Sequence, residues 1–191
     1  MASVIDFLEF KGHSAAPTLV LVGLHRHPDG DDGAFGADAV LAKCRTALKR
    51  ARAAGIPVAH ARSLGPGGGG GVLRYPPWIA GFEPVRSDMV FDLLRPSCYS
   101  NMEFSRAMDH SGGNFAIAGM FGETACLATA IDAHHRRHGF TYLADATAYR
   151  GAGSMPAHAF HDAVTQLMSC YGAVMEVAGW GRHLGLRRVV S

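Results

Sequence analysis

The sequence feature that most constrains the fold is a short, uncharged apolar run at residues 18–24, TLVLVGL. Three of its seven residues are β-branched, and none alternates with a polar side chain. Such a run is typical of a strand buried on both faces, as in a parallel sheet that helices cover on both sides. We therefore expect it to form an inner strand of an α/β domain.

Further apolar runs alternate with helical patterns along the chain. Strands are predicted at residues 18–24, 56–62, 89–93, 115–118, 140–144 and 173–177, and helices at 36–54, 102–110, 123–138 and 156–171. Gly55 follows the first helix as a C′ glycine, Asn101 is the N-cap of the second, and Pro156 lies in the first turn of the last. Strands separated by helices imply βαβ units, so the predicted fold is a three-layer α/β/α domain with a mostly parallel sheet.

The length of 191 residues suits a single domain, with residues 1–16 as an N-terminal arm. Residues 64–84 interrupt the alternation with five consecutive glycines, Gly67–Gly71, followed by prolines and aromatic side chains. This loop is interpreted as a lid, an oligomer contact or a disordered connection.

Charge and cysteine usage exclude several functional classes. The net charge is +2 with both signs interspersed, so nothing indicates nucleic-acid binding. No apolar run approaches the ~20 residues that span a bilayer, and residues 1–11 lack the pattern of a signal peptide. The four dispersed cysteines suit free thiols in a reducing compartment. We expect a soluble, cytoplasmic protein.

The best candidate for chemistry is Cys126, within AGMFGETACLATAIDA at residues 118–133. A predicted strand ends at Gly119, and Cys126 lies in the first turn of the next helix. There the unpaired N–H groups and the helix dipole favour a thiolate, which lowers the pKa of a cysteine below about 8.5. The backbone N–H groups of Ala125 and Cys126 would form an oxyanion hole. The alternative is a small thiol packed in the core.

Three motifs in this order resemble the isochorismatase-like cysteine hydrolases, the superfamily of nicotinamidases and N-carbamoylsarcosine amidohydrolases. They are AGIPV at 54–58, RPSCYS at 95–100 and the 118–133 segment. The resemblance implies a parallel sheet with helices on both sides and an Asp–Lys–Cys triad. In that triad the cysteine attacks an amide-type carbon, the aspartate shuttles the proton and the lysine positions both.

Transferred to this sequence, the resemblance makes Cys126 the nucleophile and puts Arg95 where the lysine is expected. Gly23 stands where the aspartate should close the first strand. The turn before Cys126 is one residue longer than in nicotinamidases, a length that some family members share. Arginine stays charged and can bind an anion, but it cannot lend a proton. Because the Cys126 thiol is kept and the family aspartate is lost, isochorismate cleavage is less expected than hydrolysis of an amide.

Other residues could replace the aspartate. His25 lies two residues beyond Gly23, hence on the same face of a strand, and would serve as the base of a Cys–His dyad. Loop aspartates (Asp29, Asp31 and Asp32) are the alternative. If the pocket is otherwise family-like, a Gly23→Asp variant should gain activity.

Four further residues are predicted to line a substrate pocket. They are Phe121 and Gly122 in the turn, Tyr99 near Arg95, and Trp78 at the end of the glycine loop. Their aromatic side chains would flank a planar ligand, or complete the core or an interface. Because relatives of this kind assemble, we expect a homo-oligomer and a small-molecule partner.

The eleven histidines show no strong metal-ligand pattern. His25 and His27, the group at His134, His135 and His138, and the pair His158 and His161 are more typical of polar surfaces. We predict no metal and no cofactor. A redox role for Cys126 would need a resolving thiol, for which Cys98 is the candidate.

Two functions follow from the sequence. The first is a cysteine-dependent hydrolase of a small amide or related C–N compound, with Cys126 as nucleophile and Arg95 and His25 in support. The second is a catalytically inactive family member that binds a small molecule or a partner, because Gly23 replaces the acid. An acid or imidazole within about 4 Å of the Cys126 sulfur would favour the first.

Overall fold

The structure is a computed structural model that describes residues 17–26, 34–35, 37–64, 75–150 and 154–184. Its strands are β1 (Thr18–Val22), β2 (Ala34–Phe35), β3 (Val58–Ser63), β4 (Met89–Leu93), β5 (Asn114–Met120), β6 (Gly139–Arg150) and β7 (Ala173–Met175). Its helices are α1 (Ala37–Ala53), α2 (Met102–His110), α3 (Leu127–His135), α4 (Ala157–Met168) and α5 (Val177–His183), with a 3₁₀ turn η2 (Cys98–Ser100) and a π turn η3 (Gly122–Cys126).

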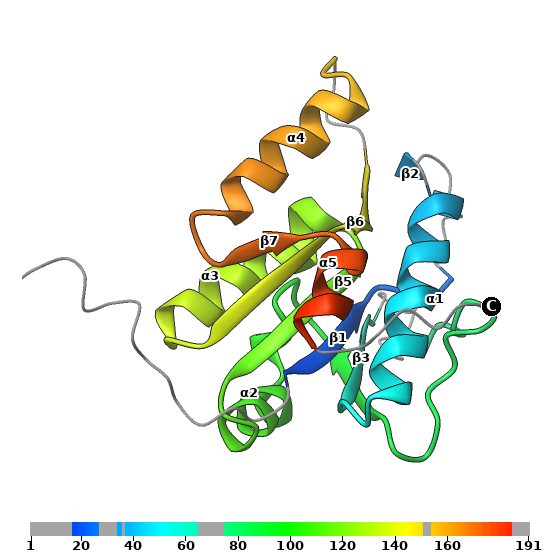
Figure 1. The fold of residues 1–191 in the computed structure, drawn as a ribbon, viewed down its shortest axis with the longest axis vertical. Coiled ribbons are helices and arrows are strands. Elements are labelled where there is room, and N and C mark those ends of the chain that lie inside the picture. The colour runs from blue at the N-terminus through cyan, green and yellow to red at the C-terminus, as the bar shows by residue number, and fades with distance from the viewer. Residues whose placement is uncertain (1–16, 27–33, 36, 65–74, 151–153, 185–191) are drawn as a thin grey trace, which may run out of the picture.

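The strands form one sheet in which β1 is central. The order runs β6-β5-β1-β3-β4, and β7 pairs with β6 at the other edge. All these pairs are parallel, and only the two-residue β2 is antiparallel, against the end of β6. The prediction of a three-layer α/β domain with a mostly parallel sheet is confirmed (Figure 1).

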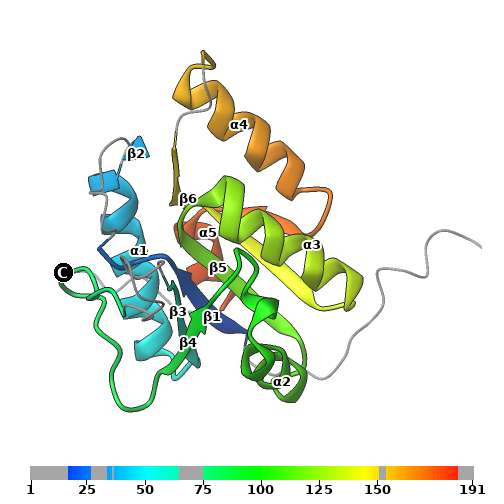
Figure 2. The same cartoon turned by 180° about the vertical axis from the view of Figure 1, so that it is seen from behind.

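The apolar run that predicted an inner strand is buried along its whole length in β1. Leu19 and Leu21 point to the core beneath α1 and α5, whereas Val20 and Val22 point to the core beneath α2, α3 and α4. The two helical layers lie on opposite faces of the sheet (Figures 1 and 2). Each face of β1 therefore contributes to a separate core.

Two predicted helix ends are confirmed by their hydrogen bonds. Gly55 has φ +67°, and the N–H groups of Gly55 and Ile56 donate to Arg52 O and Ala51 O, as in a Schellman motif. The Asn101 side chain accepts from the N–H groups of Glu103 and Phe104, so it is the N-cap of α2.

The carboxyl-terminal half of the chain departs most from the prediction. Strand β6 continues to Arg150 instead of ending at 144, because Asp145 is satisfied inside it: its carboxylate pairs with Lys43 at 2.8 Å and accepts from Val177 N at 2.8 Å. Helix α5 was not predicted, since two glycines in seven residues argue against a helix. Burial of Trp180, 2% exposed, holds it in place.

Residues 75–84, the described end of the long connection, pack onto the fold. Phe82 is fully buried, and Ile79 N donates to Leu24 O at 3.1 Å. The glycines 67–71, the N-terminal arm and the loop aspartates lie outside the described residues. Among the helices that the structure describes, none is long and apolar enough to cross a membrane.

Candidate ligand-binding pocket

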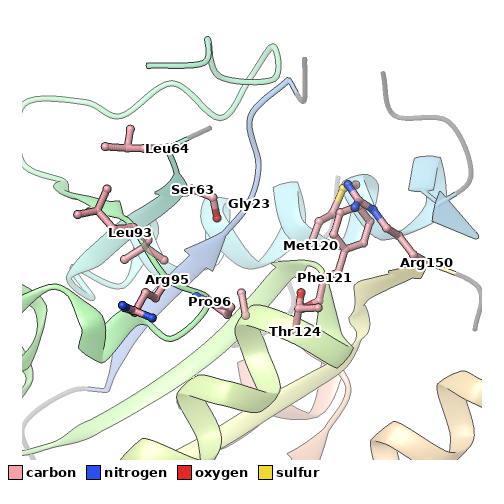
Figure 3. Close-up of a pocket in the computed structure, with 12 residues that line it drawn as sticks. Gly23, Ser63, Leu64, Leu93, Arg95, Pro96, Met120, Phe121, Thr124 and Arg150 are labelled. Atoms are coloured by element: carbon pink, nitrogen blue, oxygen red, sulfur yellow. The ribbon is translucent and has the colours of Figure 1, made fainter. Parts of the chain in front are cut away.

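A pocket of about 250 Å³ lies where the strands of the parallel sheet end. The carboxyl ends of such strands are where ligands bind in open α/β sheets. It is lined by residues at or just beyond the ends of β1, β3, β4, β5 and β6: Gly23, Ser63, Leu64, Leu93, Leu94, Arg95, Pro96, Met120, Phe121, Thr124, Ala125 and Arg150 (Figure 3). A second hollow, of about 540 Å³, lies at the amino ends of the strands.

Two glycines bring the ends of β1 and β5 close together at this pocket. Gly23 has φ +68°, and a Cβ there would lie 1.9 Å from Met120 O. Gly119 has φ +126°, and a Cβ there would lie 2.0 Å from Val22 O. An aspartate at position 23 therefore cannot fit unless the main chain moves. A gain of activity in Gly23→Asp would therefore require a shift of β1 or β5.

Cys126 is not among the residues that line the pocket. It is fully buried in the core beneath α2, α3 and α4, which also holds Cys98. Burial raises the pKa of the Cys126 thiol well above its ordinary value, and the neighbouring thiols and the Glu123 carboxylate raise it further. The expectation of a lowered thiol pKa is wrong, because the loss of hydration at this position outweighs any benefit of the helix end.

The π turn also changes the hydrogen bonding of a backbone N–H that was predicted to form the oxyanion hole. Cys126 N donates to Phe121 O at 3.3 Å, so this N–H is used within the turn. Two residues of this turn, Thr124 and Ala125, line the pocket. Ala125 directly precedes Cys126 in the sequence.

Two arginines carry the charge of the pocket. Arg95, after β4, is exposed, and Arg150, at the end of β6, places its guanidinium 4.2 Å from the centre of the Phe121 ring. Figure 3 shows them on opposite sides of the pocket. Neither forms an ion pair with any residue that the structure describes.

The other predicted site residues have different surroundings. His25 is 1% exposed and forms an isolated β-bridge with Trp78, and neither of them lines the pocket. Tyr99 is buried, with its hydroxyl 2.7 Å from His138 Nδ1. Gly122 lies in the core beside Tyr142. Of the four predicted substrate-binding residues, only Phe121 lines this pocket.

Several lining residues were missed, of which Arg150 matters most. It was missed because β6 was predicted to end at residue 144. The signal that could have found it is the run ATAYR at residues 146–150, whose Thr and Tyr suit a strand that continues to the sheet edge.

No three histidine, cysteine, aspartate or glutamate side chains in the described part of the chain are grouped to hold a metal ion. His138 instead pairs with a carboxylate, its Nε2 lying 3.0 Å from Asp109 Oδ1.

The comparison with protein families decides the relationship. Residues 19–178 match the model of the isochorismatase domain, which covers most of the chain. The chain belongs to the isochorismatase family. No curated protein matches this family member significantly in sequence.

Solved structures of similar fold agree with this assignment. A cysteine hydrolase from Pseudomonas syringae pv. phaseolicola 1448A has a TM-score of 0.80 at 19% identity, over 91% of this chain and 94% of that one. An isochorismatase from Pseudomonas putida KT2440 has a TM-score of 0.77 at 22% identity, over 86% and 90%. An isochorismatase family protein from Burkholderia thailandensis has a TM-score of 0.71 at 16% identity, over 91% and 97%. At these identities the likeness concerns the fold.

Proposed function

We propose that this isochorismatase-family protein binds a small molecule in the pocket at the carboxyl ends of its strands, without hydrolysing it through the Cys126 thiol. The observation that carries the proposal is the composition of the lining. Among the lining residues that the structure describes, there is no thiol, imidazole, carboxylate or ammonium group. Covalent hydrolysis needs an activated nucleophile with a base within hydrogen-bond reach.

The three family positions support the same conclusion. The resemblance expects aspartate, lysine and cysteine side chains to meet at such a pocket, whereas the residues that line it here are Gly23, Arg95 and Ala125. The extra residue in the turn offers a reason: it brings Ala125 to the pocket and leaves Cys126 behind it, in the core. Only the positive charge of the expected lysine is retained.

Ammonia release distinguishes binding from hydrolysis. The wild type, Cys126→Ala and the exposed-thiol control Cys170→Ala are incubated with nicotinamide and with N-carbamoylsarcosine. We expect no release above the uncatalysed background from any of them. Release that persists in Cys170→Ala and disappears in Cys126→Ala would overturn the proposal and favour the cysteine hydrolase, with Cys126, Arg95 and His25 in the roles predicted from the sequence.

A second variant tests binding itself. Ala125→Leu adds three carbons at the pocket wall, so compounds that bind the wild type should bind this variant more weakly. Fragments are screened by isothermal calorimetry against both proteins, whose folding is compared by circular dichroism. Fragments that bind both proteins equally, or no binding fragment at all, would contradict a ligand site here. The homo-oligomer and the cytoplasmic location stay predictions.

A further inference from the structure

The larger hollow, at the amino ends of the strands, has an apolar and largely aromatic floor. The floor is lined by Ile56, Phe115, Phe140 and Trp180, none of which is more than 6% exposed. The two phenylalanines belong to the core beneath α2, α3 and α4, whereas Ile56 and Trp180 belong to the core beneath α1 and α5. The hollow therefore opens where both cores meet the edge of the sheet. Its volume of about 540 Å³ has room for several apolar side chains.

The rim of this hollow carries positive charge. Gly139, which lines it, closely follows Arg136 and Arg137 in the sequence. His183, which also lines it, directly follows Arg182. All three arginines are exposed, and none of them forms an ion pair with a residue that the structure describes. An acidic segment is therefore favoured at this rim.

The chain that leads to this hollow has the matching composition. Pro17, the first residue that the structure describes, lines the hollow, so residues 1–16 join the fold at this point. Among them, residues 4–10 (VIDFLEF) hold five apolar side chains and two carboxylates. Residues 11–16, which join this segment to Pro17, span up to about 20 Å when extended, and this reach allows the segment to turn back over the hollow. A tether of this length gives a high effective concentration.

Thr18 gives a second indication that more of the chain lies at this end of the sheet. It directly follows Pro17 and is fully buried, and its hydroxyl has no hydrogen-bond partner among the described residues. A buried hydroxyl that stays unpaired destabilises a fold, so most such groups have a partner. A main-chain group of the residues before Pro17 can supply the one that Thr18 lacks.

The carboxyl-terminal residues 185–191 are the alternative occupant of the hollow. They follow Leu184, which also lines it, and their sequence is GLRRVVS. Their two arginines have the same sign of charge as the rim, and they hold three apolar side chains against the five in residues 4–10. Residues 4–10 therefore suit both the floor and the rim of the hollow better.

We propose that residues 4–10 dock in the larger hollow of their own chain, with their apolar side chains on its aromatic floor. The interaction is non-covalent, and removal of the floor and of the apolar segment from water stabilises it. It is independent of the ligand pocket at the carboxyl ends of the strands. The occupied hollow is closed to other ligands, whereas that pocket stays open.

A paramagnetic label near residues 4–10 tests this docking in the full-length chain. A nitroxide is attached to the new thiol of Ser3→Cys in a Cys170→Ser background, in which the remaining native cysteines are buried. Amide signals are recorded by NMR before and after the nitroxide is reduced with ascorbate. The loss of intensity in the paramagnetic sample reports which amides lie near the label.

The loss should be confined to the amino ends of the strands. We expect the amide signals of Ala54, Phe140 and Trp180 to lose most of their intensity, because these residues line the hollow. The amides of Ala125 and Arg150 line the pocket at the opposite ends and are the internal control. Their signals should keep their intensity.

Two pairs of substitutions in the labelled chain test which residues dock. Phe7→Ser with Leu8→Ser removes two apolar side chains from the segment and should restore most of the lost intensity. Gly12→Ser with His13→Ser is the matched control, because it introduces the same two side chains outside residues 4–10. This control should leave the loss unchanged. Circular dichroism compares the folding of all variants.

Three results would overturn the proposal. The first is the absence of a selective loss at the amino ends, which would leave the hollow to residues 185–191 or to another molecule. The second is an equal loss in the Phe7→Ser, Leu8→Ser pair and in its control. The third is the same loss in a nitrogen-15-enriched chain without a label when it is mixed with labelled chain of natural isotope abundance, which would make the occupant a second copy. None of these results bears on the proposed ligand pocket.

Discussion

At the scale of single residues, Gly23 and Gly119 determine what the pocket can contain. Each has a positive φ, and each Cβ would overlap a carbonyl oxygen of the neighbouring strand. A left-handed conformation costs a side chain about 1–2 kcal/mol by itself. The overlap adds a steric cost that only a shift of β1 or β5 could relieve.

Comparing two glycine substitutions separates these costs. Gly55 also has φ near +67°, but a Cβ there would have no atom within 4 Å. We expect Gly55→Ala to lower the free energy of unfolding by about 1 kcal/mol, and Gly23→Ala to lower it by at least about 2 kcal/mol more. Urea denaturation of both variants measures the difference. Equal losses would mean that the ends of the two strands are farther apart than described.

A second residue-scale prediction concerns the cysteines. Cys126 is fully buried with a raised pKa, whereas Cys170 is exposed. In the folded protein at pH 8, iodoacetamide should modify Cys170 and leave Cys126 unmodified, and in urea it should modify both. Peptide mass spectrometry reads the two sites in one sample. Modification of native Cys126 below pH 7 would instead indicate an accessible thiolate and contradict the burial described here.

The sequence could locate the site but could not say which of its residues faces the ligand. Arg95, Phe121 and Ala125 were predicted as site residues, and all three line the pocket. Ala125 and Cys126 are adjacent, and the π turn decides which one faces inward. Because local sequence patterns do not distinguish a π turn from an α-helical one, the thiol was given the place that Ala125 occupies.

At the scale of elements, Asp88 joins three segments just before β4. Its Oδ2 accepts from Arg52 of α1 at 2.6 Å, from His60 of β3 at 3.1 Å and from Val85 N at 3.0 Å. His60 is fully buried, and its Nδ1 has no hydrogen-bond partner among the described residues. Burial lowers the pKa of His60 despite the Asp88 carboxylate. A second ring proton would be a buried donor without an acceptor.

This arrangement makes stability depend on pH. Below about 6.5 the unfolded chain takes up a proton at residue 60 that the folded state does not, so acid favours unfolding. We expect the free energy of unfolding to fall between pH 6.5 and 5.5, with His60 contributing at most about 1.4 kcal/mol per pH unit. Urea denaturation at pH 7.5, 6.5 and 5.5 measures the decline.

Two substitutions isolate the contribution of His60. His60→Gln keeps a polar side chain without a titrating ring and should make the decline shallower. His110→Gln, on the exposed face of α2, should leave the decline as in the wild type. The same slope in the wild type and in His60→Gln would show that other groups cause the pH dependence.

Elements with strong periodic patterns were predictable, and those that depend on distant partners were not. The apolar runs of β1 and β4 and the helical pattern of α1 carry their own signal, and all three were predicted. The extension of β6 depends on Lys43 of α1 and on Val177 N to satisfy Asp145. Likewise, α5 depends on a buried Trp180. The partners of Asp145 and the α1 residues that pack against α5 are distant in sequence, so local patterns could not reveal them.

At the scale of the whole molecule, the two hollows lie at opposite ends of one sheet. The pocket with the arginines is built from the carboxyl ends of five strands, whereas the larger hollow is lined by residues such as Ala54, Phe140 and Trp180 at the amino ends. Because all strands of a parallel sheet end at the same edge, the two hollows are lined by opposite ends of the strands.

NMR titration tests the division directly. With a fragment that binds the wild type, the amide signals of Gly23, Ala125 and Arg150 should shift, because these residues line the pocket at the carboxyl ends. The signals of Ala54 and Trp180 provide the internal control and should shift much less. Larger shifts at the amino ends would place the ligand in the other hollow.

The close approach of β1 and β5 has a consequence for protein engineering. Restoring a family-like catalytic centre by introducing one side chain at a time would fail at the first step, since an acid at position 23 collides with Met120 O before it can meet any substrate. The order of changes matters: the two main chains must first be separated, and only then can an acid and a nucleophile be introduced. At position 23 the main chain of β5 limits which side chains the fold can accept.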